Sequence, residues 1–107
     1  MPGTGLTATY TERIGAGGTA TVRISPNTKQ RTWIVTQVSV ELASAPLGAT
    51  CELRRNGFLV APLIATGDVA AGEPPVRVTG SDVLTVTWAG CTAGTTAAVL
   101  IIYDEVT

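Results

Sequence analysis

The 107-residue chain has no histidine and a single lysine, and charged residues make up only 14% of it. Serine and threonine are abundant, but without histidine, and with Lys29 as the one lysine, no obvious base would activate a hydroxyl as a nucleophile. The eight carboxylates are scattered over expected strand ends and turns, so they do not indicate two acids facing each other across a cleft, as in a glycosidase. We therefore expect no catalytic residues and interpret the protein as a non-enzyme.

The same shortage of ligands argues against a metal site. Histidine is absent, and Cys51 and Cys91 do not belong to a CxxC pair, which excludes the usual zinc sites. Asp68, Glu73 and Asp82 lack the tight spacing of a calcium-binding loop. We expect no metal and no cofactor. The cysteines are either one buried thiol and one loop thiol, or a disulfide between the sheets, and the sequence leaves both alternatives open.

Long basic or apolar runs are also missing. The net charge is −1 and the densest basic spot is Arg54-Arg55, whereas nucleic-acid binding needs several cations on one face. No apolar run reaches the length of a membrane-spanning helix, and residues 1–5 lack the basic and apolar segments of a signal peptide. The glycine-rich residues 15–18 lack the Gly-Lys-Ser/Thr ending of a phosphate loop. We expect neither nucleic acid nor a membrane as a partner.

The chain does contain many short alternating runs of valine, threonine and alanine, separated by turn residues. Asn56-Gly57 between two such runs is the strongest hairpin signal, because both central positions of a type I′ turn require a positive φ. A two-residue loop would place Arg55 opposite Phe58, Leu53 opposite Val60 and Cys51 opposite Pro62. The apolar face of the hairpin would then consist of Cys51, Leu53, Phe58 and Val60.

Eight strands and no helix are predicted, at 7–14, 19–25, 32–42, the two arms of the hairpin within 49–64, 76–79, 83–89 and 96–103. This pattern is typical of an all-β protein, a single antiparallel β-sandwich of about eight strands and of the jelly-roll type. We expect the sandwich to span residues 7–107 behind a flexible N-terminal arm, residues 1–6. The long connection before Val76 indicates a crossing between the sheets. Both faces of strand 96–103 are apolar, so we expect it to be central or to lie in an interface.

Part of the surface is expected to meet another chain, because a mean hydropathy of +0.33 is high for a soluble monomer of this size. Simple alternation places Trp88 in the core and Trp33 on the polar side of its strand, beside Gln37 and Glu41. An exposed Trp33 would pack against a subunit or the arm, or would stack on a sugar. The predicted interface residues are Trp33, Arg54, Arg55, Phe58, Val99, Ile101 and Tyr103.

Four segments carry a resemblance to a known group of proteins: residues 33–40 (WIVTQVSV), 48–57 (GATCELRRNG), 82–88 (DVLTVTW) and 99–105 (VLIIYDE). Over roughly residues 20–105 the chain resembles the small accessory virion proteins of long-tailed bacteriophages that infect actinobacteria. The resemblance implies a structural virion protein, assembled in the host cytoplasm, that decorates and stabilises the capsid. The alternative is a minor tail or tail-tip protein with an adhesion or glycan-binding role.

The partners that this resemblance implies are the major capsid protein or tail subunits, and it transfers no catalytic residue. We also expect self-association, as a cyclic oligomer that matches the local symmetry of a lattice, with a trimer as the working guess.

Overall fold

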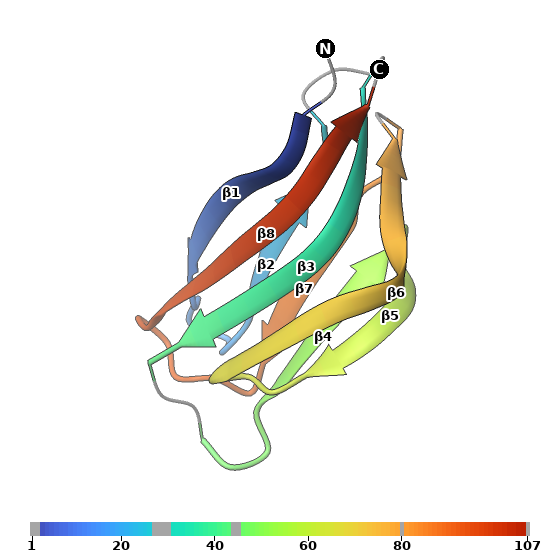
Figure 1. Cartoon of the computed structure of the whole chain (residues 1–107). Helices are drawn as coiled ribbons and strands as arrows, with labels where there is room; N and C mark the ends of the chain where they lie inside the picture. The colour runs from blue at the N-terminus through green and yellow to red at the C-terminus, as the bar shows by residue number, and fades with distance from the viewer. Residues whose placement is uncertain (1–2, 27–30, 44–45, 80, 107) are drawn as a thin grey trace.

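The computed structural model describes residues 3–26, 31–43, 46–79 and 81–106, apart from the side chains of residues 3–4 and 69–76 (Figure 1). The described residues form eight strands and no helix: β1 Gly3–Arg13, β2 Ala20–Ile24, β3 Thr32–Leu42, β4 Thr50–Arg55, β5 Phe58–Leu63, β6 Gly67–Thr79, β7 Leu84–Ala89 and β8 Thr96–Val106. Each pairing is antiparallel, in two four-stranded sheets ordered β1-β8-β3-β6 and β2-β7-β4-β5. The predicted antiparallel β-sandwich is confirmed.

The strand pairing is nested, which is the mark of a jelly roll. β1 pairs with β8, β2 with β7, β3 with β6 and β4 with β5. Paired residues lie at nearly equal distances along the sequence from the Asn56-Gly57 turn. The sequence position midway between the partners falls within three residues of this turn for Tyr10–Val99, Val22–Val86 and Trp33–Val78. The chain is therefore one long hairpin, with its tip at this turn, rolled so that successive strand pairs alternate between the two sheets.

The tip of this long hairpin has the predicted type I′ geometry. Asn56 has φ 49° and Gly57 has φ 85°, which glycine adopts freely and asparagine tolerates. Arg55 pairs with Phe58, as predicted, but a bulge follows: Leu53 faces Ala61, not Val60. The extra residue in β5 shifts the register by one, so Cys51 faces Leu63 and the predicted pairing with Pro62 is wrong.

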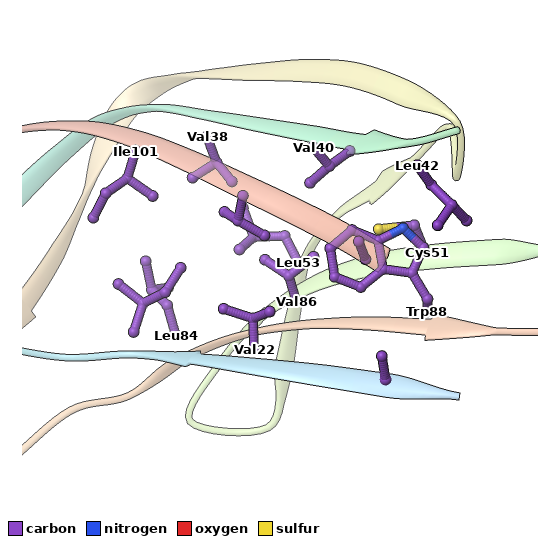
Figure 2. Packing of buried hydrophobic residues seen from close by; sticks show 14 of the residues in the cluster. Val22, Val38, Val40, Leu42, Cys51, Leu53, Leu84, Val86, Trp88 and Ile101 are labelled. Atoms are coloured by element: carbon purple, nitrogen blue, oxygen red, sulfur yellow. The ribbon is translucent and has the colours of Figure 1, made fainter. Parts of the chain in front are cut away.

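The core lies between the sheets and is built from the inward faces of both (Figure 2). β7 buries Leu84, Val86 and Trp88 with an unbroken period of two, because successive strand residues point to opposite faces. Figure 2 shows Trp88 beside Cys51, and the indole Nε1 of Trp88 donates a hydrogen bond of 3.1 Å to the Ala65 carbonyl. The prediction that Trp88 is a core residue is confirmed.

A bulge in β3 overturns the prediction for Trp33. Neither neighbouring strand offers a register partner for Thr36, and the ladders resume at Gln37. The extra residue inverts the alternation, so Trp33 and Val35 face inward before the bulge and Val38, Val40 and Leu42 face inward after it. Strict alternation puts Trp33 outside and Ile34 inside, because it assumes an unbroken strand.

Two further boundaries differ from the predictions. Residues 3–6 belong to β1 and pair with β8, through Gly3–Glu105 and Leu6–Tyr103, so they are not a flexible arm; residues 1–2 lie outside the described residues. β6 begins at Gly67 and not at Val76. The chain does cross between the sheets there, but through the short link 64–66. β8 is a central strand, between β1 and β3, as its two apolar faces indicate.

Candidate functional site

The structure divides the predicted interface residues into a buried and an exposed set. Trp33 is 6% exposed, and Val99 and Ile101 are fully buried, so none of these three side chains is available to a partner. The odd-numbered residues of β8 face the core, and the outer face of that strand carries Ala98, Leu100 and Ile102 instead. The prediction that Val99 and Ile101 lie in an interface is therefore wrong, because both side chains face the core.

Tyr103 is half-buried and belongs with the core set. Its ring stacks on Trp33, with the ring centroids 4.3 Å apart and an interplanar angle of 28°. The indole N–H of Trp33 is buried and has no acceptor among the described residues. The pair closes one end of the sandwich, and a buried indole cannot stack on a sugar.

Arg54, Arg55 and Phe58 stay at the surface, but Arg55 has a structural task. Its Nη2 lies 2.9 Å from Oδ2 of Asp82, and its Nε donates a 2.8 Å hydrogen bond to the Arg77 carbonyl. Asp82 also accepts hydrogen bonds from Asn56 Nδ2 at 2.8 Å and from Thr79, through its backbone N–H at 3.0 Å and its hydroxyl at 2.8 Å. We name this set, Arg55, Asn56, Thr79 and Asp82, the tip latch.

The tip latch fixes the end of the long hairpin to the turn between β6 and β7. Asn56 strengthens it, since its N–H donates to the Val83 carbonyl and its Oδ1 accepts from the Val83 N–H, both at 2.9 Å. The hydrogen bonds from Asn56 and Thr79, with Arg55 nearby, lower the pKa of Asp82 below its ordinary value. The sequence does not reveal the contacts of Arg55 and Asn56, because their partners are 22 to 27 residues away.

Arg54 is half-exposed and its charge is already matched. Its Nη2 lies 3.2 Å from both carboxylate oxygens of Glu52, and its Nη1 donates to the Gly57 carbonyl at 3.0 Å. A surface ion pair of this kind contributes at most about 1 kcal/mol. Arg54 therefore leaves little net charge on the outer face of the hairpin.

The most unusual surface feature is on β5. Phe58 is 79% exposed, Leu59 51%, Val60 42% and Ile64, directly after the strand, 64%. We name these four side chains the β5 patch. β5 is the edge strand of its sheet, as Figure 1 shows, so along one side of the strand no described strand follows. Isolated apolar residues on a surface are ordinary, whereas the β5 patch has three exposed apolar residues on one edge strand and a fourth directly after it.

Two features of β5 reduce the risk of uncontrolled pairing at this edge. Pro62 cannot donate a hydrogen bond to an added strand, and the bulge at Val60 interrupts the regular spacing of backbone groups. A continuous backbone ladder along the outer edge of β5 is therefore disfavoured. A sequence signal for the patch exists: the seven residues 58–64, Phe-Leu-Val-Ala-Pro-Leu-Ile, are all apolar.

A second surface feature is a recess of about 270 Å³ between β1 and β2. It is lined by Tyr10, Thr11, Glu12, Thr21, Val22 and Arg23. Partial burial is the main cause that raises the pKa of Tyr10. No three His, Cys, Asp or Glu side chains of the described part of the chain group together as metal ligands.

Cys51 and Cys91 are free thiols and form no disulfide between the sheets. Both are buried, so Cys91 is not the exposed loop thiol that the first alternative suggested. Burial, followed by the neighbouring Cys91, raises the pKa of Cys51 to about 12. A thiol with such a pKa is protonated at neutral pH and therefore a poor nucleophile.

Within the described ranges there is also no helix long and apolar enough to span a bilayer.

No known family model and no curated protein matches the chain. Among solved structures, the crystal structure of FlhE is similar over 96% of both chains, with a TM-score of 0.51 and 15% sequence identity. Dimeric latent PorU from Porphyromonas gingivalis matches 94% of this chain and 13% of its own, with a TM-score of 0.38 and 12% identity. The likeness to FlhE concerns the fold alone, and the likeness to PorU carries no argument.

Proposed function

We propose that this protein is a structural component of a bacteriophage virion that binds and stabilises the capsid surface. The observation that carries the proposal is the β5 patch, where Phe58 and three aliphatic side chains stand in solvent on an edge strand. Covering apolar side chains is favourable in water, so a neighbouring protein surface that removes them from solvent gains free energy. A decoration protein works by such contacts and needs no reaction chemistry.

Two further observations support this function. Residues 33–40, 48–57, 82–88 and 99–105 resemble small accessory virion proteins, and the jelly roll is a fold that viral capsid proteins use. The same fold also serves lectins, so it does not select the function by itself. A protein that binds the assembled shell more tightly than its free subunits stabilises the shell by mass action, and many weak sites add up.

The alternative of a minor tail or tail-tip protein has less support in its glycan-binding form. Its glycan-binding form depends on an exposed Trp33, and the indole is buried under Tyr103. A minor tail protein that binds other tail subunits through the β5 patch is still compatible with the exposed side chains. Copy number and position on the particle separate this alternative from decoration.

The test is to add the purified chain back to particles that lack it. We expect wild-type protein to bind the head in many copies and to raise the temperature at which the shell breaks. Phe58→Lys should weaken binding at least tenfold, because aromatic anchors often contribute about 2 kcal/mol or more to an interface. Leu100→Lys is the matched control, since Leu100 is 38% exposed on the outer face of the other sheet.

Three outcomes would count against decoration. Equal binding by the wild-type and Phe58→Lys proteins would mean that the β5 patch does not contribute to particle binding. A few copies found on the tail would favour the minor tail protein. Absence of the chain from particles, together with failure to bind them when added, would end the proposal.

A further inference from the structure

We propose that the free edge of β1 binds an extended segment of another polypeptide, which adds to the four-stranded sheet as a further strand antiparallel to β1. Side chains on one face of this segment enter the recess between β1 and β2. The contact lies on the opposite side of the sandwich from the β5 patch, because β1 adjoins β2 on one side and β5 adjoins β6 on the other. The inference therefore goes beyond the proposed function and does not depend on it.

Of the four edge strands in the described part of the chain, β1 is the least protected against pairing. β5 has Pro62 and the bulge at Val60, β6 contains two adjacent prolines, and β2 is only five residues long. β1 instead keeps an unbroken register with β8 from Leu6 to Arg13, without a proline or a lysine, and Figure 1 shows it at the outer edge of its sheet. Such an edge is a template for another extended backbone.

The hydrogen bonds of β1 and β8 show which backbone groups face each way. The Ile14 N–H donates to the Thr95 carbonyl at 2.8 Å, and paired residues of an antiparallel ladder alternate between bonded and non-bonded pairs. The even-numbered residues of β1 are therefore bonded to β8. The Ile102 carbonyl agrees with this register, because it accepts from the Thr36 hydroxyl of β3 and so faces away from its register partner Thr7.

The odd-numbered residues Thr7, Thr9 and Thr11 consequently point their N–H and C=O groups out of the sheet, where no described strand pairs with them. Their side chains are exposed as well. These residues recur ~6.8 Å apart, at every second position of the strand, which is the repeat of another extended chain. A small molecule has no such repeat, so the edge selects a polypeptide.

The recess supplies contacts for the side chains of the added strand. Thr11 is one of its lining residues, so it lies directly beside the free backbone groups. The half-buried Tyr10 and the buried Val22 pack on the core and give the recess an apolar floor. A volume of about 270 Å³ over such a floor suits an aliphatic side chain.

Charge at the recess defines the partner further. Glu12 and Arg23 both line it, both are exposed, and neither forms an ion pair within the described ranges. β1 runs into the turn at 15–18 and β2 runs out of it, and Glu12 is nearer to this turn along the chain than Arg23 is. A segment antiparallel to β1 runs away from the turn. It therefore fits with a basic, an aliphatic and an acidic residue in this order, at every second position.

The test is an NMR titration of the full chain with the peptide Thr-Lys-Thr-Val-Thr-Glu-Thr, blocked at both ends. The amide signals of Thr7, Thr9 and Thr11 should shift, and their hydrogen exchange should slow. N-methylation of the peptide along its pairing edge should abolish binding, whereas N-methylation along the other edge should not. Absence of these shifts at several millimolar peptide, or equal binding by the two methylated peptides, would overturn strand addition.

Substitutions separate the backbone contact from the side-chain contact. Thr9→Pro should lower the affinity about tenfold, because it removes one outward N–H, and Thr9→Ala, which keeps that N–H, should bind like the wild type. The methylated peptides leave the protein unchanged, so the test does not depend on the folding of Thr9→Pro. Equal losses in Thr9→Pro and Thr9→Ala would contradict a backbone contact.

Two controls test the direction of the segment and the identity of the occupant. The charge-reversed peptide Thr-Glu-Thr-Val-Thr-Lys-Thr should bind more weakly, and equal or tighter binding would overturn the antiparallel order of charges. Slower exchange of the β1 amides with rising protein concentration, without peptide, would identify a second copy as the occupant and overturn the assignment to another polypeptide. Phe58→Lys should bind the peptide normally, so this proposal and the proposed function fail separately.

Discussion

The two arms of the hairpin at Asn56-Gly57 differ in burial in the opposite sense to their composition, since β4 (TCELRR) has two apolar residues and β5 (FLVAPL) has only apolar ones. β4 buries Cys51 and Leu53, each 1% exposed, whereas β5 leaves Phe58, Leu59 and Val60 largely in solvent. The difference comes from their places in the sheet. β4 lies between β7 and β5, under the opposite sheet, and β5 is the edge. Hydrophobicity alone therefore does not identify the core of this protein.

This comparison also assigns different tasks to the two arms. The side chains of β4 stabilise the fold, since burying an apolar side chain is worth about 1.5 to 3 kcal/mol. Phe58, Leu59 and Val60 of β5 add less to the stability of the fold, because their side chains remain largely in solvent. The tip latch joins the end of β4 and the Asn56-Gly57 turn to the turn after β6, so β5 begins from a fixed tip.

The largest expected effect tests the difference in burial between β4 and β5 directly. Leu53→Ala should destabilise the protein by about 2 to 5 kcal/mol, because it leaves a cavity between the sheets. Leu59→Ala, the same change on the exposed arm, should cost less than about 1 kcal/mol, since its side chain is already half in solvent. Urea unfolding at low protein concentration measures both, and equal losses would mean that β5 is part of the core.

The contrast between the arms also shows what the sequence could predict. Turn chemistry and period-two alternation are local, so the Asn56-Gly57 tip, the number of strands and the core position of Trp88 were all predictable. The bulges at Thr36 and Val60 were not, because one extra residue inverts a face without any local composition signal. Trp33 was therefore predicted on the wrong side.

The candidate site was predictable only in part. Phe58 and the hairpin tip were identified, but Leu59, Val60 and Ile64 were not, because exposure on both faces of β5 depends on its edge position. That position follows from nested pairing along the whole chain. The tip latch was missed for a similar reason, since Asp82 meets Asn56 only after β6 and β7 are in place.

A smaller effect tests the turn that connects the two arms. Gly57→Ala should cost about 1 kcal/mol, because an alanine there must adopt the left-handed conformation. A Cβ at Gly57 would meet nothing within 4 Å, so the cost is due to the backbone alone. Gly17→Ala is the matched control, with equal space and no positive φ, and should change the free energy of unfolding little. The same loss at both positions would argue against a strained turn.

The smallest effect appears only in acid and concerns the tip latch, which holds the end of β4 and the Asn56-Gly57 turn. The pKa of Asp82 is lower in the folded protein than the ordinary value of about 3.9 in an unfolded chain, mainly because Asn56 and Thr79 donate hydrogen bonds to the carboxylate. Its contribution is therefore complete above about pH 5 and is lost progressively as the pH falls through 4 toward the folded pKa. Urea midpoints should fall between pH 6 and pH 2.5 in the wild type and fall less in Asp82→Asn, with Glu41→Gln, a change at an exposed carboxylate, as the control. If Asp82→Asn loses as much stability in acid as the wild type, the carboxylate does not hold the tip, and the exposed arm must be positioned by the strand pairing of β4 and β5 alone.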